Sequence, residues 1–125
     1  MMHARLNPAG PVPHRKISEI FLDFAAPLLR TMPADATDAS FTRVLSLAST
    51  VWNAMVLADV QGDRHYLDRL REAVQHAPGG LALVTQLVER KRTLFGQDHY
   101  CIGAYKVTRQ AGEIRLWAEA RTVPQ

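Results

Sequence analysis

The chain has 125 residues, 47% of them apolar and 22% charged, which is typical of one globular domain and not of a disordered or fibrous chain. Its single cysteine, Cys101, excludes an intramolecular disulfide framework and favours a cytoplasmic location, and we find neither a signal-peptide pattern nor the roughly 18 apolar residues of a membrane helix. The net charge is +3, and the whole excess lies in residues 81–125, where seven Lys and Arg accompany four Asp and Glu.

The first 13 residues contain three prolines and little hydrophobic pattern. We therefore predict a disordered or loosely docked tail, followed by a single domain over residues 14–125. A first helix is predicted over about 18–32, with Ser18 as its N-cap. Pro27 lacks the N–H that would bond the carbonyl of Asp23, so it either kinks this helix or ends it.

A second helix is predicted over about 39–60, with Asp38 as its N-cap. Apolar residues cover most of its circumference, which indicates a helix at the centre of the fold. One narrow polar stripe remains, formed by Arg43, Ser46, Thr50 and Asn53.

Two further helices are predicted, over about 64–77 with Asp63 as the cap and over about 81–95 with Gly96 just beyond the end. The third helix has a single apolar stripe and an opposite face rich in charge. The stripe expected to be buried in the fourth helix contains Leu81, Val84, Leu87, Val88, Leu94 and Phe95.

The hydrophobic period then changes from that of a helix to that of a strand. Residues 100–109 and 113–122 alternate between apolar and polar, and Gly112 lies between them. This pattern predicts a β-hairpin.

The register of the hairpin depends on the length of its loop. A two-residue loop would place Tyr105 and Val107 on the core face. A three-residue loop would place Ile102 and Ala104 there, with Trp117 opposite Tyr105 on the outer face. We favour the three-residue loop, because a type I′ turn of two residues would also force an alanine to a positive φ.

The predicted fold class is α+β, with a four-helix array followed by a C-terminal antiparallel hairpin. A lone hairpin is marginally stable in water. We therefore expect it to pack on the helices or to pair with a second copy in a dimer, for which its strand edges are available.

The reactive side chains do not form a recognisable catalytic or metal site. Cys101 and His99 are two residues apart on a strand and could approach each other, but the surrounding sequence has no signature of a cysteine enzyme, and a small buried thiol is the simpler interpretation. His65 and His76 lie in no metal-binding spacing, and the charged face around His65 contains arginines that would repel a cation. We expect no metal and no cofactor.

The polar stripe of the second helix is a candidate ligand pocket, formed by Ser46, Thr50 and Asn53 with Trp52 on its wall. Polar groups on a central helix can also serve as hydrogen-bonding partners for neighbouring elements. A third interpretation is that these residues form the solvent side of the helix.

The basic C-terminal third is a candidate partner surface. Its members are Arg90, Lys91, Arg92, Tyr105, Lys106, Arg115, Trp117 and Arg121. Cations combined with exposed aromatic rings can bind nucleic acid. Against this interpretation, acidic residues interrupt the region, and consecutive residues of a helix point about 100° apart.

We recognise no family in the sequence. The favoured hypothesis is a small non-enzymatic cytoplasmic interaction or regulatory protein that self-associates, without a membrane partner. The alternatives are a nucleic-acid-binding module that uses the basic C-terminal third, and a small-ligand binder or enzyme centred on the second helix.

Overall fold

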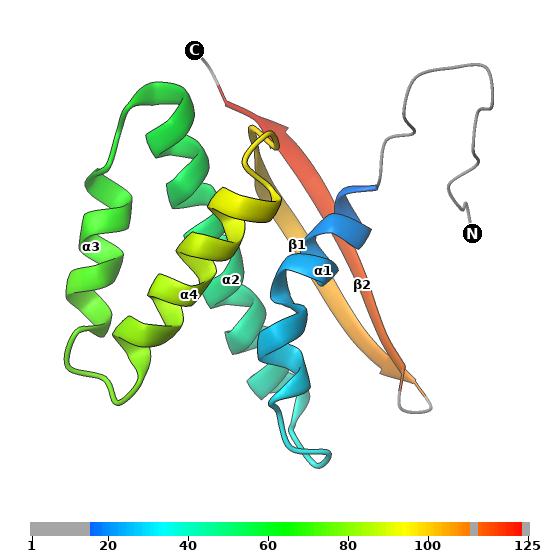
Figure 1. Ribbon diagram of the computed structural model, residues 1–125. Helices are drawn as coiled ribbons and strands as arrows, with labels where there is room; N and C mark the ends of the chain where they lie inside the picture. Colours follow the sequence, from blue (N-terminus) through cyan, green and yellow to red (C-terminus); the bar gives the residue numbers. More distant parts are fainter. Residues whose placement is uncertain (1–15, 111–112, 124–125) are drawn as a thin grey trace, which may run out of the picture.

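A computed structural model describes residues 16–110 and 113–123, which form four helices followed by a two-stranded antiparallel sheet (Figure 1). The elements are α1 (Ile17–Arg30), α2 (Asp38–Gln61), α3 (His65–Val74), α4 (Gly80–Leu94), β1 (Tyr100–Gln110) and β2 (Glu113–Thr122). The predicted α+β class is confirmed, and the hairpin packs on the helices. The predicted tail over residues 1–13 lies outside the described residues.

Several helix ends differ from the prediction: α1 ends at Arg30, and Arg64, not Asp63, is the N-cap residue of α3. Two further differences have local reasons. Thr37, and not Asp38, is the N-cap of α2, because the Thr37 hydroxyl accepts a hydrogen bond from the N–H of Ser40 at 3.1 Å. Helix α3 ends at Val74, where the amide of Ala77 bonds the Val74 carbonyl in a three-residue turn and not in a further α-helical turn.

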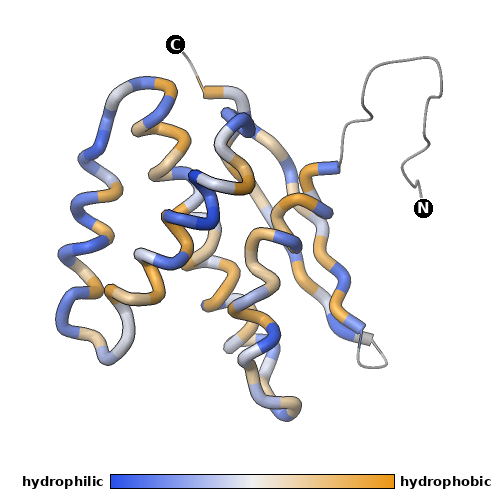
Figure 2. Tube along the Cα trace, in the orientation of Figure 1, coloured by the Kyte–Doolittle hydropathy of each residue, from blue (hydrophilic) through white to orange (hydrophobic). Residues whose placement is uncertain are grey.

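Helix α2 lies at the centre of the fold and contacts α1, α3, α4 and β1. It is long and apolar enough to cross a membrane by length and composition, with 24 residues and an 18-residue window of mean hydropathy 1.2. The expectation that no segment approaches this limit was therefore wrong. Burial in the core explains the apolar composition of this helix, since it contacts four other elements and leaves a narrow stripe with Arg43, Ser46 and Thr50 exposed. Helix α3, at the left edge of Figure 2, is by contrast mostly hydrophilic and buries Leu67 alone.

Trp52 of α2 is fully buried at the meeting point of three other elements. Its ring lies 5.2 Å from Phe24 of α1, 5.6 Å from Phe95 at the end of α4 and 5.8 Å from Tyr100 of β1. Such edge and tilted contacts between aromatic rings are favourable beyond the area that they bury. The ring cluster therefore connects α1, α2, α4 and β1.

The buried stripe of α4 is shorter than predicted at both ends. Leu81 and Leu94 lie in the first and last turns of the helix, and their side chains are 43% and 59% exposed. The core positions are Val84, Leu87 and Val88, followed by the fully buried Lys91 and by Phe95 just after the helix. The residues at positions 84, 87, 88, 91 and 95 follow the spacing of one helix face.

The hairpin adopts the register of a two-residue loop, so the favoured three-residue register was wrong. Gln110 pairs with Glu113, and Trp117 pairs with Lys106 and not with Tyr105. Tyr105 instead faces the core, where its ring lies 5.6 Å from Phe21 of α1.

An irregularity at Gly103 explains why both proposed sets of core residues contribute to the core. The register shifts between Ile102 and Ala104, which adds one residue to β1 and changes its alternation at that point. Ile102 before the bulge and Tyr105 after it therefore both face the helices, whereas Ala104 is exposed.

Side chains from the helices bind the outer edges of both strands. The amide of Asn53 donates from Nδ2 to the carbonyl of Ile102 at 3.0 Å and accepts from its N–H at 2.7 Å. The hydroxyl of Ser18 accepts from the N–H of Ala118 at 2.8 Å, so Ser18 binds the hairpin and is not the helix cap that was predicted. These contacts take the positions that a third strand would use, which is one way in which proteins protect sheet edges.

We predict that Asn53→Ala lowers the free energy of unfolding by about 1–3 kcal/mol, because it leaves the N–H and carbonyl of Ile102 without their partner. Thr50→Ala is the matched control, since Thr50 is exposed on the same helix and should change stability by less than about 0.5 kcal/mol. Urea unfolding measures both. Equal effects of the two variants would contradict this role of Asn53.

Candidate functional site

The four residues of the candidate ligand pocket divide between two environments. Trp52 is in the core, where its Nε1 donates to the carbonyl of Tyr100 at 2.8 Å, and Asn53 binds Ile102. Ser46 and Thr50 are exposed, and the Thr50 hydroxyl donates to the Ser46 carbonyl within the helix at 2.8 Å. The structure thus uses the buried Trp52 and the half-buried Asn53 to hold β1 and does not bring the four side chains together.

The three consecutive cations at the end of α4 point in different directions. Arg92 is exposed and pairs with Glu89. Arg90 is directed toward α1, and Lys91 is fully buried, so its assignment to a surface was wrong. The 100° step of an α-helix separates them, as the sequence had indicated.

Arg90 compensates for the proline inside α1. Pro27 lies within the helix and has no N–H to donate to the carbonyl of Asp23. Nη2 of Arg90 donates to that carbonyl at 2.8 Å, and Nε donates to the neighbouring carbonyl of Phe24 at 3.2 Å. Pro27 therefore does not end α1, and a side chain from α4 replaces the missing donor.

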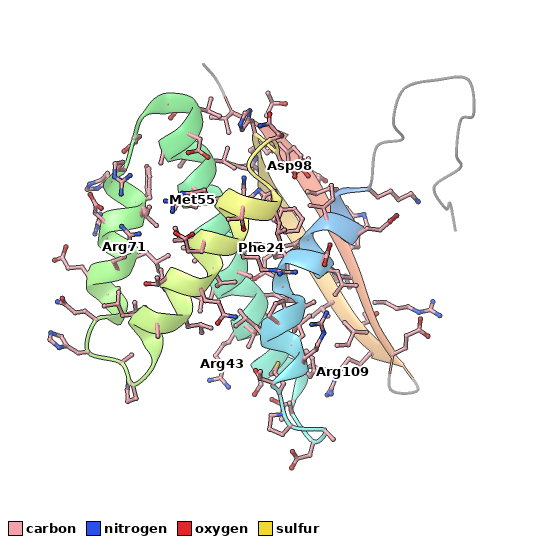
Figure 3. The ribbon with its side chains drawn as sticks, viewed as in Figure 1. Phe24, Arg43, Met55, Arg71, Asp98 and Arg109 are labelled. Carbon is pink, nitrogen blue, oxygen red and sulfur yellow. The ribbon has the colours of Figure 1, made fainter. Side chains whose placement is uncertain are left out.

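Lys91 is the buried polar residue of the described core. Its ammonium donates to the carbonyls of Phe95 at 2.6 Å and Asp98 at 3.0 Å, and it lies 4.6 Å from the centre of the Trp52 ring. These carbonyls belong to the end of α4 and to the turn before β1, where Figure 3 labels Asp98. Burial lowers the pKa of Lys91 from its usual 10.5, while the carboxylates of Asp59 and Asp98 oppose that shift.

Cys101 and His99 have separate environments. The Cys101 thiol is partly buried, and burial raises its pKa, although Arg121 and Lys91 oppose the shift. A raised pKa keeps the thiol protonated and poorly nucleophilic at neutral pH. His99 is exposed and its Nε2 lies 3.0 Å from the carbonyl of Gly96. Within residues 16–110 and 113–123, no group of three or more His, Cys, Asp or Glu side chains is arranged to hold a metal ion.

A hollow of about 600 Å³ lies between the α1–α2 loop and the hairpin, and Arg109 lines it. Figure 3 labels Arg109 near the start of α2. Its Nε donates to Asp38 at 3.0 Å, its Nη2 donates to the carbonyl of Ala36 at 2.6 Å, and the guanidinium lies 4.4 Å from the centre of the Phe41 ring. These contacts explain the position of Arg109 as a link between the hairpin and α2.

Lys106, Arg115, Trp117 and Arg121 of the predicted partner surface lie together on one side of the hairpin, whereas Tyr105 faces the core, so its assignment to that surface was wrong. We define the outer hairpin face as the exposed residues of the sheet that point away from the helices: Ala104, Lys106, Thr108, Glu113, Arg115, Trp117, Glu119 and Arg121. Side chains alternate along a strand, so the residues between them, including Tyr105, Leu116 and Ala118, pack against the core.

Trp117 lies in the middle of the outer hairpin face and is 53% exposed. Lys106 is its partner on β1, and Arg115 and Glu119 flank it on β2. The large exposed apolar side chains of the described residues are Tyr66, Leu81, Leu94 and Trp117, and Trp117 is the one on the sheet. An exposed tryptophan with charged neighbours is the composition of a protein-binding hot spot.

The glycine of the bulge accommodates a cation of this face. A Cβ atom built at Gly103 would lie 3.2 Å from Nε and 3.4 Å from Cβ of Arg121. The Arg121 side chain therefore lies across β1 over the bulge. The acidic members Glu113 and Glu119 were not included in the predicted surface, although their alternation with Arg115 and Arg121 is visible in the sequence.

Comparison of the chain with protein-family models, with curated proteins and with solved structures finds no match. The outer hairpin face is therefore interpreted from its own residues.

We predict that Arg90→Ala lowers the free energy of unfolding by about 1–3 kcal/mol, since the carbonyl of Asp23 loses the donor that replaces the missing N–H of Pro27. The loss should be smaller in a Pro27→Ala background, because an alanine at that position supplies the N–H that bonds the carbonyl of Asp23. A double-mutant cycle in urea measures this coupling. Additive effects of the two substitutions would contradict the proposed compensation.

We predict that Lys91 makes stability rise with pH between its lowered folded-state pKa and 10.5. In that window the unfolded state binds more protons than the folded state, so the free energy of unfolding increases with pH. Lys91→Met removes this contribution, and the stability difference between wild type and Lys91→Met should change in favour of the wild type as the pH rises toward 10.5.

Urea unfolding at several pH values, from neutral to about 10.5, measures this difference. The other titrating groups are present in both proteins and cancel to first order. Arg92→Met is the matched control on the exposed side of the same helix, and its difference from wild type should not change with pH in this way. If the free energy of unfolding of the wild type, relative to that of Lys91→Met, stays constant or falls as the pH rises, Lys91 is not a buried lysine with a lowered pKa.

Proposed function

We propose that the protein is a small non-enzymatic interaction protein that self-associates through the outer hairpin face. The observation that carries the proposal is the half-exposed ring of Trp117 in the middle of a sheet face that points away from α1 and α2. Tryptophan and arginine are the residues most enriched at the energetic centres of protein interfaces, and Arg115 lies next to Trp117 on the same face.

The edge contacts favour binding to the face over the addition of a strand. Asn53 binds the backbone of Ile102 on the β1 edge, and Ser18 binds the backbone of Ala118 on the β2 edge. A strand that paired along either edge would have to displace these side chains. A partner that packs flat on the outer hairpin face would leave them in place.

The charge distribution argues against the alternative of a nucleic-acid-binding module. Lys106, Arg115 and Arg121 share the face with Glu113 and Glu119, and Arg90 and Lys91 are directed into the fold. Phosphate binding gains its strength from several convergent cations. Alternating charges fit a protein partner better, and the cytoplasmic location suggested by the single thiol remains part of this proposal.

We predict that the wild-type protein forms dimers at about 50 µM, the range in which a modest interface is populated. Trp117→Ser should raise the dissociation constant by at least about thirtyfold, since it removes a central aromatic residue from each copy, and one such residue contributes about 2 kcal/mol to an interface. Tyr66→Ser is the matched control, because Tyr66 has nearly the same exposed fraction, 54%, and lies on α3. Sedimentation velocity and light scattering measure the mass, and circular dichroism checks the fold.

A wild-type protein that remains monomeric at that concentration would overturn the proposal. A dimer that persists unchanged in Trp117→Ser would move the interface to another surface.

A further inference from the structure

The charges on the outer side of β2 are arranged antisymmetrically about Trp117. Going along the strand, the outward residues are Glu113, Arg115, Trp117, Glu119 and Arg121. Two positions before the tryptophan the charge is positive, and two positions after it the charge is negative. Four positions away on each side, the signs are again opposite. A surface with this property is complementary to itself when one copy is reversed.

Within residues 16–110 and 113–123, the charges of this pattern have no counterpart of opposite sign. On β1, Arg115 pairs with Thr108 and Glu119 pairs with Ala104, and neither partner is charged. Arg115 and Glu119 themselves are four residues apart on one strand, about 13 Å. The ion pairs within the described residues, Arg90–Asp23, Arg92–Glu89 and Arg109–Asp38, involve other side chains.

We propose, on the basis of the self-association proposed above, that a second copy of the chain packs face to face on the outer hairpin face with the two β2 strands antiparallel and with Trp117 at the two-fold axis. The two-fold axis runs across the strands at Trp117. A residue that lies a given number of positions before Trp117 in one copy then faces the residue that lies the same number of positions after Trp117 in the other copy. Arg115 of each copy then faces Glu119 of the other copy, so one interface contains this pair twice.

The opposite orientation is excluded by the same charges. If the two β2 strands ran parallel, each residue would face its own copy, so Arg115 would meet Arg115 and Glu119 would meet Glu119. Like charges brought together across an interface are unfavourable and exclude the wrong arrangement. The pattern therefore selects the antiparallel orientation.

The dimensions of packed sheets indicate which charge pairs contribute most. Aligned sheets lie about 10 Å apart and cross at about 30°. Arg115 and Glu119 are each about 7 Å from Trp117 along the strand, where this crossing displaces facing residues by only about 3–4 Å. Glu113 and Arg121 lie twice as far from the axis, and Arg121 is turned over Gly103. The inner pair is thus the main recognition element.

The two tryptophan rings would meet at the axis and exclude water from the centre of the interface. Lys106, the cross-strand partner of Trp117, would then lie near its own copy. Its long apolar stem can cover the ring while the ammonium turns to solvent at the rim. The one like-charge contact of the arrangement, between the two copies of Lys106, therefore lies at the solvent-exposed rim of the interface.

Charge reversal tests the proposal with four proteins: Arg115→Glu, Glu119→Arg, the double variant with both substitutions, and the wild type. Each single variant converts both inner pairs into like-charge pairs, so each should dimerise about tenfold more weakly. The double variant restores opposite charges and should return to within about threefold of the wild type.

The decisive sample is an equimolar mixture of the two single variants. Arg115→Glu presents Glu at both inner positions and Glu119→Arg presents Arg at both, so both inner pairs join a glutamate with an arginine. The inner pairs of this heterodimer have opposite charges in either orientation, so the comparison with the wild type reports the orientation. Antiparallel strands make the heterodimer as strong as the wild type, whereas parallel strands would make it stronger than the wild type, because the parallel wild type would contain like-charge pairs. The mixture should therefore associate as strongly as the wild type. A mixture stronger than the wild type would overturn the antiparallel arrangement.

Sedimentation velocity gives the dissociation constants, and native mass spectrometry of differently tagged chains identifies the heterodimer. Thermal unfolding of each variant checks that the monomer is intact.

A general charge effect predicts a different result. Arg115→Glu lowers the net charge of +3 and Glu119→Arg raises it, so bulk repulsion would change the two dimers in opposite directions. Arg69→Glu on the exposed face of α3 has the same net charge as Arg115→Glu and should dimerise like the wild type.

A mixture that associates no better than its components would overturn this arrangement. Self-association of the wild type and its loss in Trp117→Ser would then still support the proposed function. A wild-type protein that is monomeric would overturn both.

Discussion

The pair of hydrogen bonds between Asn53 and Ile102 determines how the hairpin lies on the helices. The amide binds the backbone of β1 as a neighbouring strand would, and Trp52, the preceding residue, binds the carbonyl of Tyr100. Ile102 pairs with Ala120 of β2, and side chains alternate along β2, so fixing Ile102 against the core also fixes which residues of β2 point outward. Asn53 lies on the opposite side of the sheet from Trp117 and does not touch it. The contact nevertheless leads to the exposure of Trp117, because it sets the register that turns this side chain away from the helices.

Two cations inside the fold bind main-chain carbonyls. Arg90 replaces the donor that Pro27 lacks in α1, and Lys91 binds carbonyls at the end of α4 and in the turn that follows it. Both positions are interruptions of regular hydrogen bonding, where carbonyls need donors from outside the helix. The run of three cations therefore serves the packing of α4 on its neighbours, and Arg92 is its solvent-exposed member.

Periodicity and turn residues were sufficient to predict the number and order of the elements, because each helix and strand has a clear apolar pattern. The register was not predictable from the loop, since the bulge at Gly103 lies well away from it in the sequence and changes the alternation of β1. The burial of Lys91 was detectable from its spacing with Val88 and Phe95, but a lysine is normally assigned to the surface. The role of Asn53 required the position of β1, which no local pattern contains.

The proposed interface would also limit the size of the assembly. An exposed sheet edge can add strands without end, whereas a two-fold face-to-face contact consumes the outer hairpin face of both copies and closes the pair. Asn53 and Ser18 occupy backbone groups on the two edges, and the antisymmetric charges about Trp117 select a single orientation for the face. Edge protection and charge pattern therefore act in the same direction, because the first removes the open-ended mode of pairing and the second specifies the closed one.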